Sequence, residues 1–277
     1  MKRDITKILG IKIDSLTKEE ALSSVEEIIG RSRAAFIATP NTEMIIKAQG
    51  DDHFREMLND KSALNLPDSY GLLWAGRFQT LWAPKTPGLR QIIVLLEWIF
   101  SILILPLATR AYHYPIKSKL SGSDFIWDLS RLAAVKRYKL FLFGGGPTVA
   151  EQAALRLQTE ILGLRIGGMM SGDLSKSDEV VEAVKKSRSE ILLVCLGAPL
   201  QEEWLVENLK ATGAKIGIGL GGTFDFVARV VPRAPSWMQH AGLEWLFRLI
   251  IEPKRLFRQM ALPKFMFLML LDRLKSG

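Results

Sequence analysis

Residues 138–152 read YKLFLFGGGPTVAEQ, and this stretch decides the fold class. The apolar run at residues 138–143 has the length of a buried strand, and three glycines and a proline end it. A segment with helical spacing follows directly. A strand that leads through a glycine loop into a helix is typical of α/β proteins.

Five more apolar runs of strand length occur along the chain, and helical patterns follow most of them. They are AAFIAT at 34–39, ALNL at 63–66, LRIGGM at 164–169, EILLVCLG at 190–197 and AKIGIGL at 214–220. This alternation predicts an α/β fold, with a Rossmann-like, mostly parallel sheet and helices on both faces. In such sheets ligands bind at the carboxyl ends of the strands, so we expect the functional residues in the strand-to-helix turns.

The composition excludes several classes of protein. With 277 residues and 48% hydrophobic content, the chain can bury a large core, which excludes a disordered protein. Its one cysteine, Cys195, lies in an apolar run, which excludes an internal disulfide and argues against a cysteine-based metal site. The N-terminal stretch MKRDITKILGIKID has no continuous apolar segment of the signal-peptide type, so we expect a cytoplasmic protein.

The formal charge of +8 is concentrated in two segments. Residues 85–119 carry five basic residues against one acidic residue, and residues 229–277 carry nine basic residues against three acidic ones. Both segments are also apolar, which fits an anionic membrane surface better than a nucleic acid groove. No zinc-finger, RNP or helix-turn-helix signature is present. We therefore expect a membrane surface, and no nucleic acid, among the partners.

Residues 89–109 read LRQIIVLLEWIFSILILPLAT, an apolar run of about 20 residues, which is near the length that spans a bilayer. A single crossing would put the two halves of one sheet on opposite sides of the membrane. We therefore predict a hairpin, a re-entrant segment or an interfacial helix at the cytoplasmic face, so that the protein is peripheral or monotopic. A buried core helix or a contact in a homo-oligomer is the alternative. KFMFLMLLDRLK at 264–275 is predicted to be a second interfacial element.

The same patterns predict two parts of the chain. Residues 1–228 are predicted to form the α/β catalytic domain, with an apolar helical insertion at about 79–119 that associates with the membrane. Residues 229–277 are predicted to form a basic, amphipathic, helical C-terminal appendage.

Asp68 is the strongest candidate for a catalytic base. It follows the predicted strand at 63–66, so it lies at a sheet edge among apolar neighbours. Partial desolvation there would raise the pKa of its carboxyl toward the range of a general base. The pattern fits equally well an aspartate that caps the helix at 70–77, and both interpretations stay open.

Two glycine-rich turns are candidates for nucleotide binding. Residues 144–146 precede a helix whose free N–H groups would face an anion such as phosphate, although such glycines also form ordinary tight turns. Thr148 and Glu151 have the spacing of a capping box at the start of that helix. GIGLGG at 217–222 has the G-x-G-x-x-G spacing of dinucleotide-binding folds, but two prolines precede the next clear helix, which argues against NAD.

Two kinds of catalytic site are not supported by the motifs. The three histidines lie near no nucleophile motif such as G-x-S-x-G, which argues against a hydrolase triad. No D-x-D motif is present, so we expect no metal to be held against a diphosphate. A sugar-nucleotide enzyme with this sequence would offset the leaving-group charge with side chains or backbone groups.

An ordered set of motifs runs from about residue 10 to residue 260: TPNTEM, LPDSYGLLWAGR, SGSDF, FLFGGGP, CLGAPLQEEW, GGTFDF and RAPSWMQHAGLEWLFRLIIEPKRLFR. This set resembles the WecG/TagA/CpsF family of bacterial glycosyltransferases. The resemblance implies an inverting, metal-independent hexosyltransferase without a cofactor. Its donor would be a UDP-sugar, often of N-acetylmannosamine or its uronic acid, and its acceptor a polyprenyl-diphosphate-linked N-acetylglucosamine, in cell-surface polysaccharide or teichoic acid synthesis. A nucleotide-dependent oxidoreductase and a non-catalytic membrane scaffold are the alternatives.

The resemblance also implies roles for individual residues. Asp68 matches the catalytic base, and Thr39 and Asn41 match the polar pair of a T-x-N motif in the same pocket. The residues that match motifs around the nucleotide are Gly144, Gly145, Gly197, Pro199 and Gln201. The arginines that match those expected to close over the diphosphate are Arg248, Arg255 and Arg258. The family usually has glycine after the aspartate, where this chain has Ser69.

Overall fold

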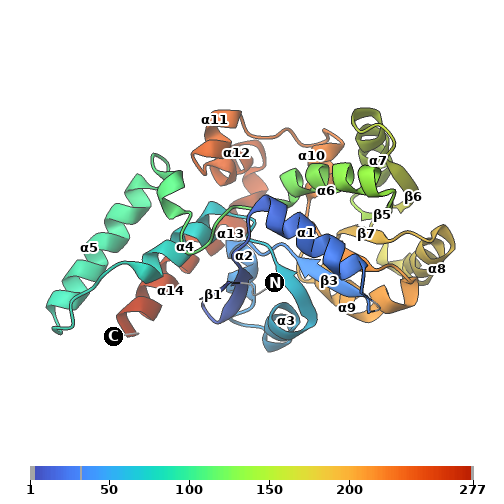
Figure 1. Ribbon diagram of the computed structural model, residues 1–277. Helices are drawn as coiled ribbons and strands as arrows, with labels where there is room; N and C mark the ends of the chain where they lie inside the picture. The colour runs from blue at the N-terminus through green and yellow to red at the C-terminus, as the bar shows by residue number, and fades with distance from the viewer. Residues whose placement is uncertain (1–3, 32, 276–277) are drawn as a thin grey trace.

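The computed structural model describes residues 4–31 and 33–275, and a six-stranded parallel sheet lies at its centre (Figure 1). The strand order is β4-β3-β8-β7-β5-β6. The strands are β3 (Ala35–Ala38), β4 (Ser62–Asn65), β5 (Lys139–Gly144), β6 (Arg165–Met170), β7 (Ile191–Cys195) and β8 (Ile216–Gly219). Each strand coincides with one of the six predicted runs to within a residue or two at its ends. The predicted α/β fold is confirmed.

Helices cover both faces of this sheet, as predicted (Figure 1). Successive strand residues point to opposite faces, so Leu140 and Leu142 belong to one hydrophobic core, and Phe141 and Phe143 to the other. The first core is covered by α1 (Lys18–Ile29), α6 (Gly122–Lys136), α7 (Val149–Glu160) and α10 (Thr223–Val227). The second core is covered by α2 (Thr42–Lys47), α3 (Asp52–Glu56), η1 (Met57–Lys61), α4 (Tyr70–Thr80), α8 (Ser177–Ser187) and α9 (Leu200–Thr212). A short η3 (Leu174–Lys176) precedes α8.

An N-terminal hairpin that the sequence did not reveal supports the end of β4. It consists of β1 (Ile5–Ile8) and β2 (Ile11–Asp14), which pair antiparallel. The Asp14 carboxylate accepts a hydrogen bond from the backbone N–H of Asn65 (2.7 Å), the last residue of β4. The hairpin therefore stabilises the strand end that leads to Asp68.

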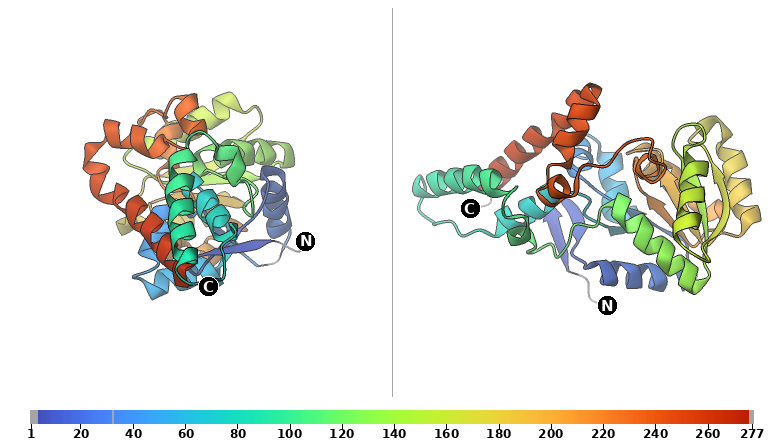
Figure 2. Two further views of the ribbon diagram at one scale, coloured as in Figure 1. Left: turned by 90° about the vertical axis from the view of Figure 1, so that its left-hand side faces the viewer. Right: turned by 90° about the horizontal axis from the view of Figure 1, so that it is seen from above.

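The apolar run folds as α5 (Leu89–Ile104), which projects from one end of the molecule beside α4 and α14 (Figures 1 and 2). One side of α5 is anchored, because Val94 is buried and Trp74 Nε1 donates to Ser101 Oγ (2.9 Å). The other side is exposed, with Leu103 at 71% of its full exposure. The alternative of a buried core helix is therefore wrong. In the part of the chain that the structure describes, no helix has both the length and the apolar character needed to cross a membrane.

The chain returns from α5 through η2 (Thr109–Tyr112) and packs into the body again. Tyr112 donates from its hydroxyl to the carbonyl of Ser101 (2.7 Å), and Ile116 is fully buried in the same core as Trp74. The segment between α4 and α6 is thus packed against the fold at both of its ends.

The C-terminal segment consists of α11 (Ser236–His240), α12 (Glu244–Ile251), η4 (Pro253–Arg255), α13 (Leu256–Gln259) and α14 (Ala261–Lys275). Residues 264–275, expected to be a second interfacial element, lie within α14, which is buried on one side and exposes Phe267 (53%) on another. Phe265, Met269 and Leu270 of α14 are buried, and the Phe265 ring meets the Trp74 ring edge-on at 6.4 Å. This side of α14 is buried because it packs against α2, α4 and α5.

Gly144 is required by the packing of β5 against β7. Its φ is +133°, and a Cβ on it would collide with the backbone carbonyl of Cys195. Next to it, Gly145 donates from its backbone N–H to that same carbonyl (2.9 Å). The predicted capping box is wrong, because Thr148 has a φ of +64° and its side chain makes no capping hydrogen bond.

We expect Gly144→Ala to destabilise the fold more than Gly163→Ala, which serves as the matched control. Gly163 also has a positive φ (+81°), but a Cβ there would meet nothing within 4 Å. The difference between the two variants therefore reports the steric collision rather than the loss of glycine, and forced packing costs about 1–3 kcal/mol. Urea denaturation measures the free energy of unfolding, and equal losses in both variants would contradict the packing role.

Candidate active site

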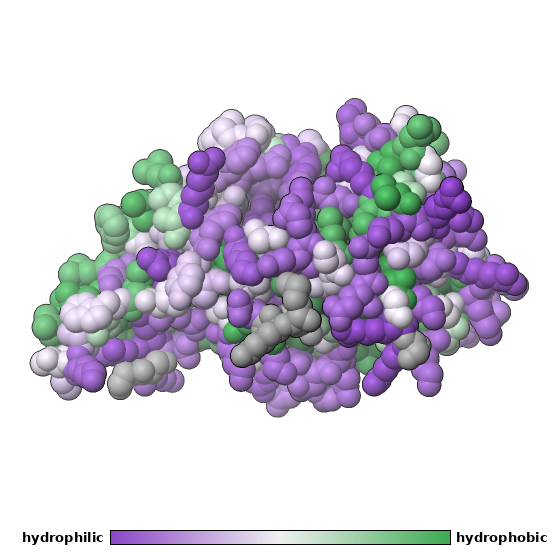
Figure 3. All heavy atoms as spheres, in the orientation of Figure 1, coloured by the Kyte–Doolittle hydropathy of each residue, from purple (hydrophilic) through white to green (hydrophobic). Residues whose placement is uncertain are grey.

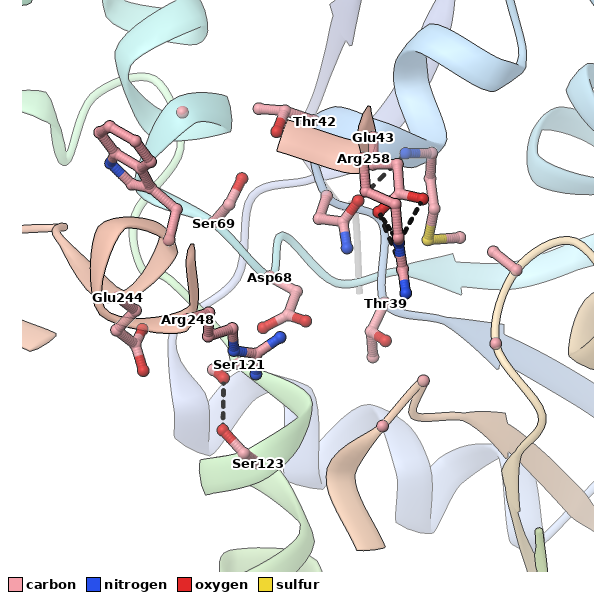
Figure 4. Close-up of a pocket in the computed structure, with 18 of the residues that line it drawn as sticks. Thr39, Thr42, Glu43, Asp68, Ser69, Ser121, Ser123, Glu244, Arg248 and Arg258 are labelled. Atoms are coloured by element: carbon pink, nitrogen blue, oxygen red, sulfur yellow. Dashed lines mark hydrogen bonds and ion pairs between the residues drawn. The ribbon is translucent and has the colours of Figure 1, made fainter. Parts of the chain in front are cut away.

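One pocket lies at the carboxyl ends of β4, β3, β8 and β7, with a cavity volume of about 440 Å³. Thr39 and Asn41 reach it from the turn after β3, Asp68 from the turn after β4, Gly197 from β7 and Thr223 from β8. Helices α12 to α14 contribute further side chains (Figure 4). Sheet edges of this kind are the usual ligand sites of α/β proteins, and the volume suits a small molecule.

Asp68 points into this pocket and does not cap α4. Its backbone N–H donates to the carbonyl of Pro40 (2.8 Å), and its Oδ1 accepts from the backbone N–H of Gly122 (3.2 Å). The N-cap position of α4 belongs to Ser69, which makes no side-chain capping bond. Of the two interpretations that the sequence left open, the structure supports a carboxylate that faces the pocket (Figure 4).

Burial raises the pKa of the Asp68 carboxyl from its ordinary value to about 6. Lys119, a hydrogen bond from Ser121 and Arg248 lower this pKa, and Glu244 raises it, but burial outweighs them. A carboxylate of this kind is ionised at neutral pH and is still basic enough to accept a proton.

Ser69, which stands where the family usually has glycine, fits its position without strain. Its φ is −153° and its ψ is 149°, which is extended backbone that any residue adopts. Its hydroxyl lines the pocket, is buried, and has no hydrogen-bond partner among the described residues. A buried hydroxyl without a partner is available to a bound ligand.

Thr39 and Asn41 both line the pocket, and the fold also uses both of them. Thr39 donates from Oγ1 to the carbonyl of Gly219 (2.8 Å), which ties the end of β3 to β8. Asn41 is the N-cap of α2, and its Oδ1 accepts from the backbone N–H of Met44 (3.0 Å). The structure places these residues beside Asp68, as the resemblance implied.

Gln201 is held in a single orientation inside the pocket wall. Its Nε2 donates to Glu202 Oε1 (2.7 Å), and its Oε1 accepts from the backbone N–H of Gly221 (2.9 Å). Glu202 is fully buried, and burial raises the pKa of its carboxyl to about 7. Gln201 therefore links α9 to the turn after β8.

The other residues expected around a nucleotide divide into two groups. Gly197 lines the pocket and has a φ of +78°. Gly144, Gly145 and Pro199 are not among the residues that line it. For Gly144 the packing against Cys195 supplies a structural reason instead.

The GIGLGG motif is likewise explained by packing. Gly217 and Gly219 lie within β8, where a Cβ on Gly217 would collide with Leu205, and one on Gly219 would lie 2.7 Å from the amide nitrogen of Gln201. These glycines let α9 approach the strand closely.

Arg248 and Arg258 reach the pocket from two different helices. The chain leaves helical geometry at Glu252 (φ −124°, ψ 77°), so the arginines do not share one helix face. The Arg248 guanidinium lies 4.3 Å from the centre of the Phe226 ring and close enough to Asp68 to lower its pKa. Arg258 donates to the Glu43 carboxylate at 2.9–3.2 Å (Figure 4). Arg255 lies in η4, and its side chain is outside the described part of the structure.

Lys119 and Glu244 are pocket residues whose pairing the sequence did not predict. Lys119 Nζ lies 2.8 Å from Glu244 Oε2 and 4.9 Å from the centre of the Tyr70 ring. Arg233 continues the ion-pair chain from Glu244 to Asp124 on α6. No local pattern connects Lys119 with Glu244, although Lys119 lies two residues before the SGSDF motif at 121–125.

The pocket contains charges of both signs. Four cationic side chains line it, Lys47, Lys119, Arg248 and Arg258, together with four carboxylates, Glu43, Asp68, Asp225 and Glu244. Charge-assisted hydrogen bonds from cationic groups bind phosphate oxygens strongly. Within residues 4–31 and 33–275, no group of three or more histidine, cysteine, aspartate or glutamate side chains is placed to hold a metal ion.

Comparison with known proteins gives an independent result. The sequence profile of the glycosyl transferase WecG/TagA/CpsF family matches residues 6–101 and 101–277, which is nearly the whole chain.

Three similar enzymes are all named N-acetylglucosaminyldiphosphoundecaprenol N-acetyl-beta-D-mannosaminyltransferase. The one from Bacillus subtilis (strain 168) is 30% identical over 57% of this chain, and the aligned part spans 61% of that enzyme. The one from Bacillus spizizenii is 24% identical over 86% of this chain and 79% of the enzyme. The one from Staphylococcus aureus (strain MRSA252) is 24% identical over 94% of this chain and 90% of the enzyme.

We expect Asp68→Asn to stabilise the protein at pH 7.5. An unfolded aspartate ionises near pH 3.8, whereas Asp68 in the fold ionises near pH 6, so the folded state holds the proton more tightly. Stability therefore falls as the pH rises from about 4 to 6 and stays lower above that range. Asparagine carries no charge, so the melting temperature of the variant should exceed that of the wild type at pH 7.5 and approach it near pH 4.

Asp173→Asn is the control for this measurement. Hydrogen bonds from Ser175 lower the pKa of the Asp173 carboxyl, so the fold favours the ionised form of this group. Removing the carboxylate in Asp173→Asn should therefore not raise the melting temperature at pH 7.5. If Asp68→Asn melts below the wild type at every pH, the fold does not disfavour the ionised form of Asp68.

Proposed function

Because the chain belongs to the WecG/TagA/CpsF family of glycosyl transferases, we propose that it transfers N-acetylmannosamine, or a related hexose, from a UDP-sugar to a polyprenyl-diphosphate-linked N-acetylglucosamine. The names of the three similar enzymes support this acceptor and this sugar. The observation that carries the proposal is the position of Asp68, a carboxylate with a raised pKa, in one pocket with four cationic side chains. The product would serve cell-surface polysaccharide or teichoic acid synthesis.

The Asp68 carboxylate acts as the general base of this reaction. It accepts the proton of an acceptor sugar hydroxyl while that oxygen attacks the anomeric carbon from the face opposite UDP. The bond between the anomeric carbon and the UDP oxygen breaks, UDP leaves with the electron pair, and the configuration is inverted. The Gly122 N–H, which donates to Asp68 Oδ1 (3.2 Å), fixes the carboxylate for this step.

Cationic side chains, rather than a divalent metal, offset the negative charge of the diphosphates. The donor and the acceptor each carry a diphosphate. The pocket that receives these two groups is lined by Lys47, Lys119, Arg248 and Arg258. Groups aimed at developing charge in a partly desolvated site stabilise a leaving group effectively. The ion pair between Arg258 and Glu43 is half-exposed, so a bound diphosphate can replace Glu43 as the partner of Arg258.

A membrane-facing surface on α5 brings the enzyme to its lipid-linked acceptor. We define this α5 apolar face by five exposed side chains: Leu89, Ile92, Leu96, Phe100 and Leu103. Hydrophobic side chains gather over this end of the molecule (left in Figure 3). Lys85 and Arg110, both exposed, flank the face, as suits an anionic bilayer surface. An interfacial helix of this kind makes the protein peripheral or monotopic.

We expect Asp68→Asn to lower the transfer rate by about 100-fold or more, because general-base catalysis contributes at least that much. In the wild type the rate should rise with pH through about 6, as Asp68 loses its proton. Mass spectrometry of the products from a UDP-sugar and a lipid-linked N-acetylglucosamine measures the rate. EDTA should leave the wild-type rate unchanged.

Asp68→Glu is the conservative variant in this assay. It keeps a carboxylate but moves it by one methylene group, so it should retain more activity than Asp68→Asn and keep a rising pH limb. If Asp68→Asn retains more than half of the wild-type rate, Asp68 is not the base.

We expect the triple variant Leu96→Gln, Phe100→Gln and Leu103→Gln to bind anionic liposomes at least about tenfold more weakly, since each buried apolar side chain contributes about 1.5–3 kcal/mol. Leu155→Gln with Leu162→Gln is the matched control, because these leucines of α7 and its following turn are 66% and 98% exposed. Liposome co-sedimentation gives the partition coefficient. If the triple variant instead loses self-association and keeps its lipid binding, the α5 apolar face is a contact between copies in a homo-oligomer.

A further inference from the structure

The pocket that contains Asp68 has an apolar end. Leu105, Leu262, Met266 and Trp245 line the same cavity as Asp68 and the cationic side chains, and we call these four residues the apolar end. They come from three elements: Leu105 directly follows α5, Leu262 and Met266 lie on α14, and Trp245 lies on α12. Leu105, Leu262 and Met266 offer no N–H or O–H donor to a diphosphate or a sugar hydroxyl, so they suit an apolar part of a ligand.

The contact between α5 and α14 builds this apolar end. Trp98 of α5 donates from Nε1 to the backbone carbonyl of Met266 (2.9 Å), which holds the two helices together. Leu262 and Met266 are four residues apart on α14 and therefore share one face of the helix.

Gly71 lines the cavity between Thr42 and the apolar end. A Cβ on it would lie 2.5 Å from the Thr42 methyl group and 3.9 Å from Leu262 Cδ1, so any larger residue would have to displace the Thr42 side chain.

One cavity contains the three kinds of group that the acceptor requires. Asp68 interacts electrostatically with Lys119, Lys119 pairs with Glu244 (2.8 Å), and the apolar end lines the same cavity. A base, a cation and an apolar end suit a sugar hydroxyl, a diphosphate and an isoprenoid chain.

The apolar end also continues into the surface of α5. Leu105 lies between Leu103, which belongs to the α5 apolar face and is 71% exposed, and Leu107, which is 88% exposed. Leu105 is therefore the residue at which the cavity and the exposed apolar side chains of α5 come closest along the chain.

We propose that the apolar end binds the first isoprene units of the polyprenyl chain of the acceptor, so that the lipid leaves the active site between α5 and α14. This assignment rests on the proposed function. A shallow depression with Phe257 and Met260, which shares Arg258 and Glu43 with the pocket, is the competing exit that the labelling experiment below distinguishes.

The test compares two water-soluble acceptors, N-acetylglucosamine diphosphate carrying either a methyl group or a chain of three isoprene units. The measured quantity is the ratio of kcat/KM for the prenyl acceptor to kcat/KM for the methyl acceptor. In Leu262→Asn and in Met266→Gln this ratio should fall about tenfold, since a tenfold change corresponds to about 1.4 kcal/mol, the transfer free energy of about two methylene groups.

Leu155→Gln is the matched control, because Leu155 on α7 is 66% exposed and is not among the residues that line the cavity. It should keep the wild-type ratio. An unchanged ratio in both Leu262→Asn and Met266→Gln, or an equal fall in Leu155→Gln, overturns the proposal.

A binding measurement separates this inference from the proposed function. A prenyl acceptor analogue with a diazirine on its second isoprene unit should label the peptide at 261–266 of the wild-type protein. Labelling of α13 instead, with transfer to the methyl acceptor intact, overturns the lipid path and leaves the function standing. Absence of transfer to either acceptor overturns the function itself, and the lipid path with it.

Discussion

The active site depends on the backbone hydrogen bonds that hold the loop after β4. Leu66 donates to the carbonyl of Ala38 (2.9 Å) and Asp68 donates to that of Pro40 (2.8 Å), so the loop extends the pairing with β3 beyond the end of the strand. From the other side, Leu120 donates to the carbonyl of Pro67 (2.7 Å). The chain can therefore leave after α4, form α5 and return to the same place, because both ends of the excursion are bonded to the sheet. Long insertions are tolerated when their ends are fixed in this way.

The C-terminal helices are held over the pocket by two ion pairs of different strength. Lys119 is 13% exposed and Glu244 is 27% exposed, and this pair is further supported by Arg233. Arg258 is 58% exposed, and solvent screens its pair with Glu43. The α12 side of the cover is therefore bound more firmly to the body than the α13 side. The weaker pair, Arg258 with Glu43, therefore lies on the side of the pocket that contains Gly197. The stronger pair, Lys119 with Glu244, lies on the side that contains Asp68.

Local patterns in the sequence were enough to predict the sheet and the place of Asp68 at its edge, and the family resemblance added Thr39, Asn41 and Gln201. Buried parallel strands are continuous apolar runs with glycine or proline at their ends, so all six strands could be read directly. Thr39, Asn41, Asp68 and Gln201 line the pocket because each directly follows one of those strands or begins the next helix, and the carboxyl ends of parallel strands meet at one edge. The apolar run that became α5 was also visible, although its pattern did not distinguish a buried helix from one with an exposed apolar side.

What the sequence by itself determined was therefore the α/β fold and the turns that carry its polar residues, because both follow from short-range periodicity. Only the tertiary structure decided which of those residues meet. Gly144 proved to be a packing residue, since its contact lies on a different strand. The pair of Lys119 with Glu244 and the approach of Leu262 to the pocket join segments more than 100 residues apart. Such contacts depend on how α12 and α14 return across the sheet edge, and no local pattern contains that information.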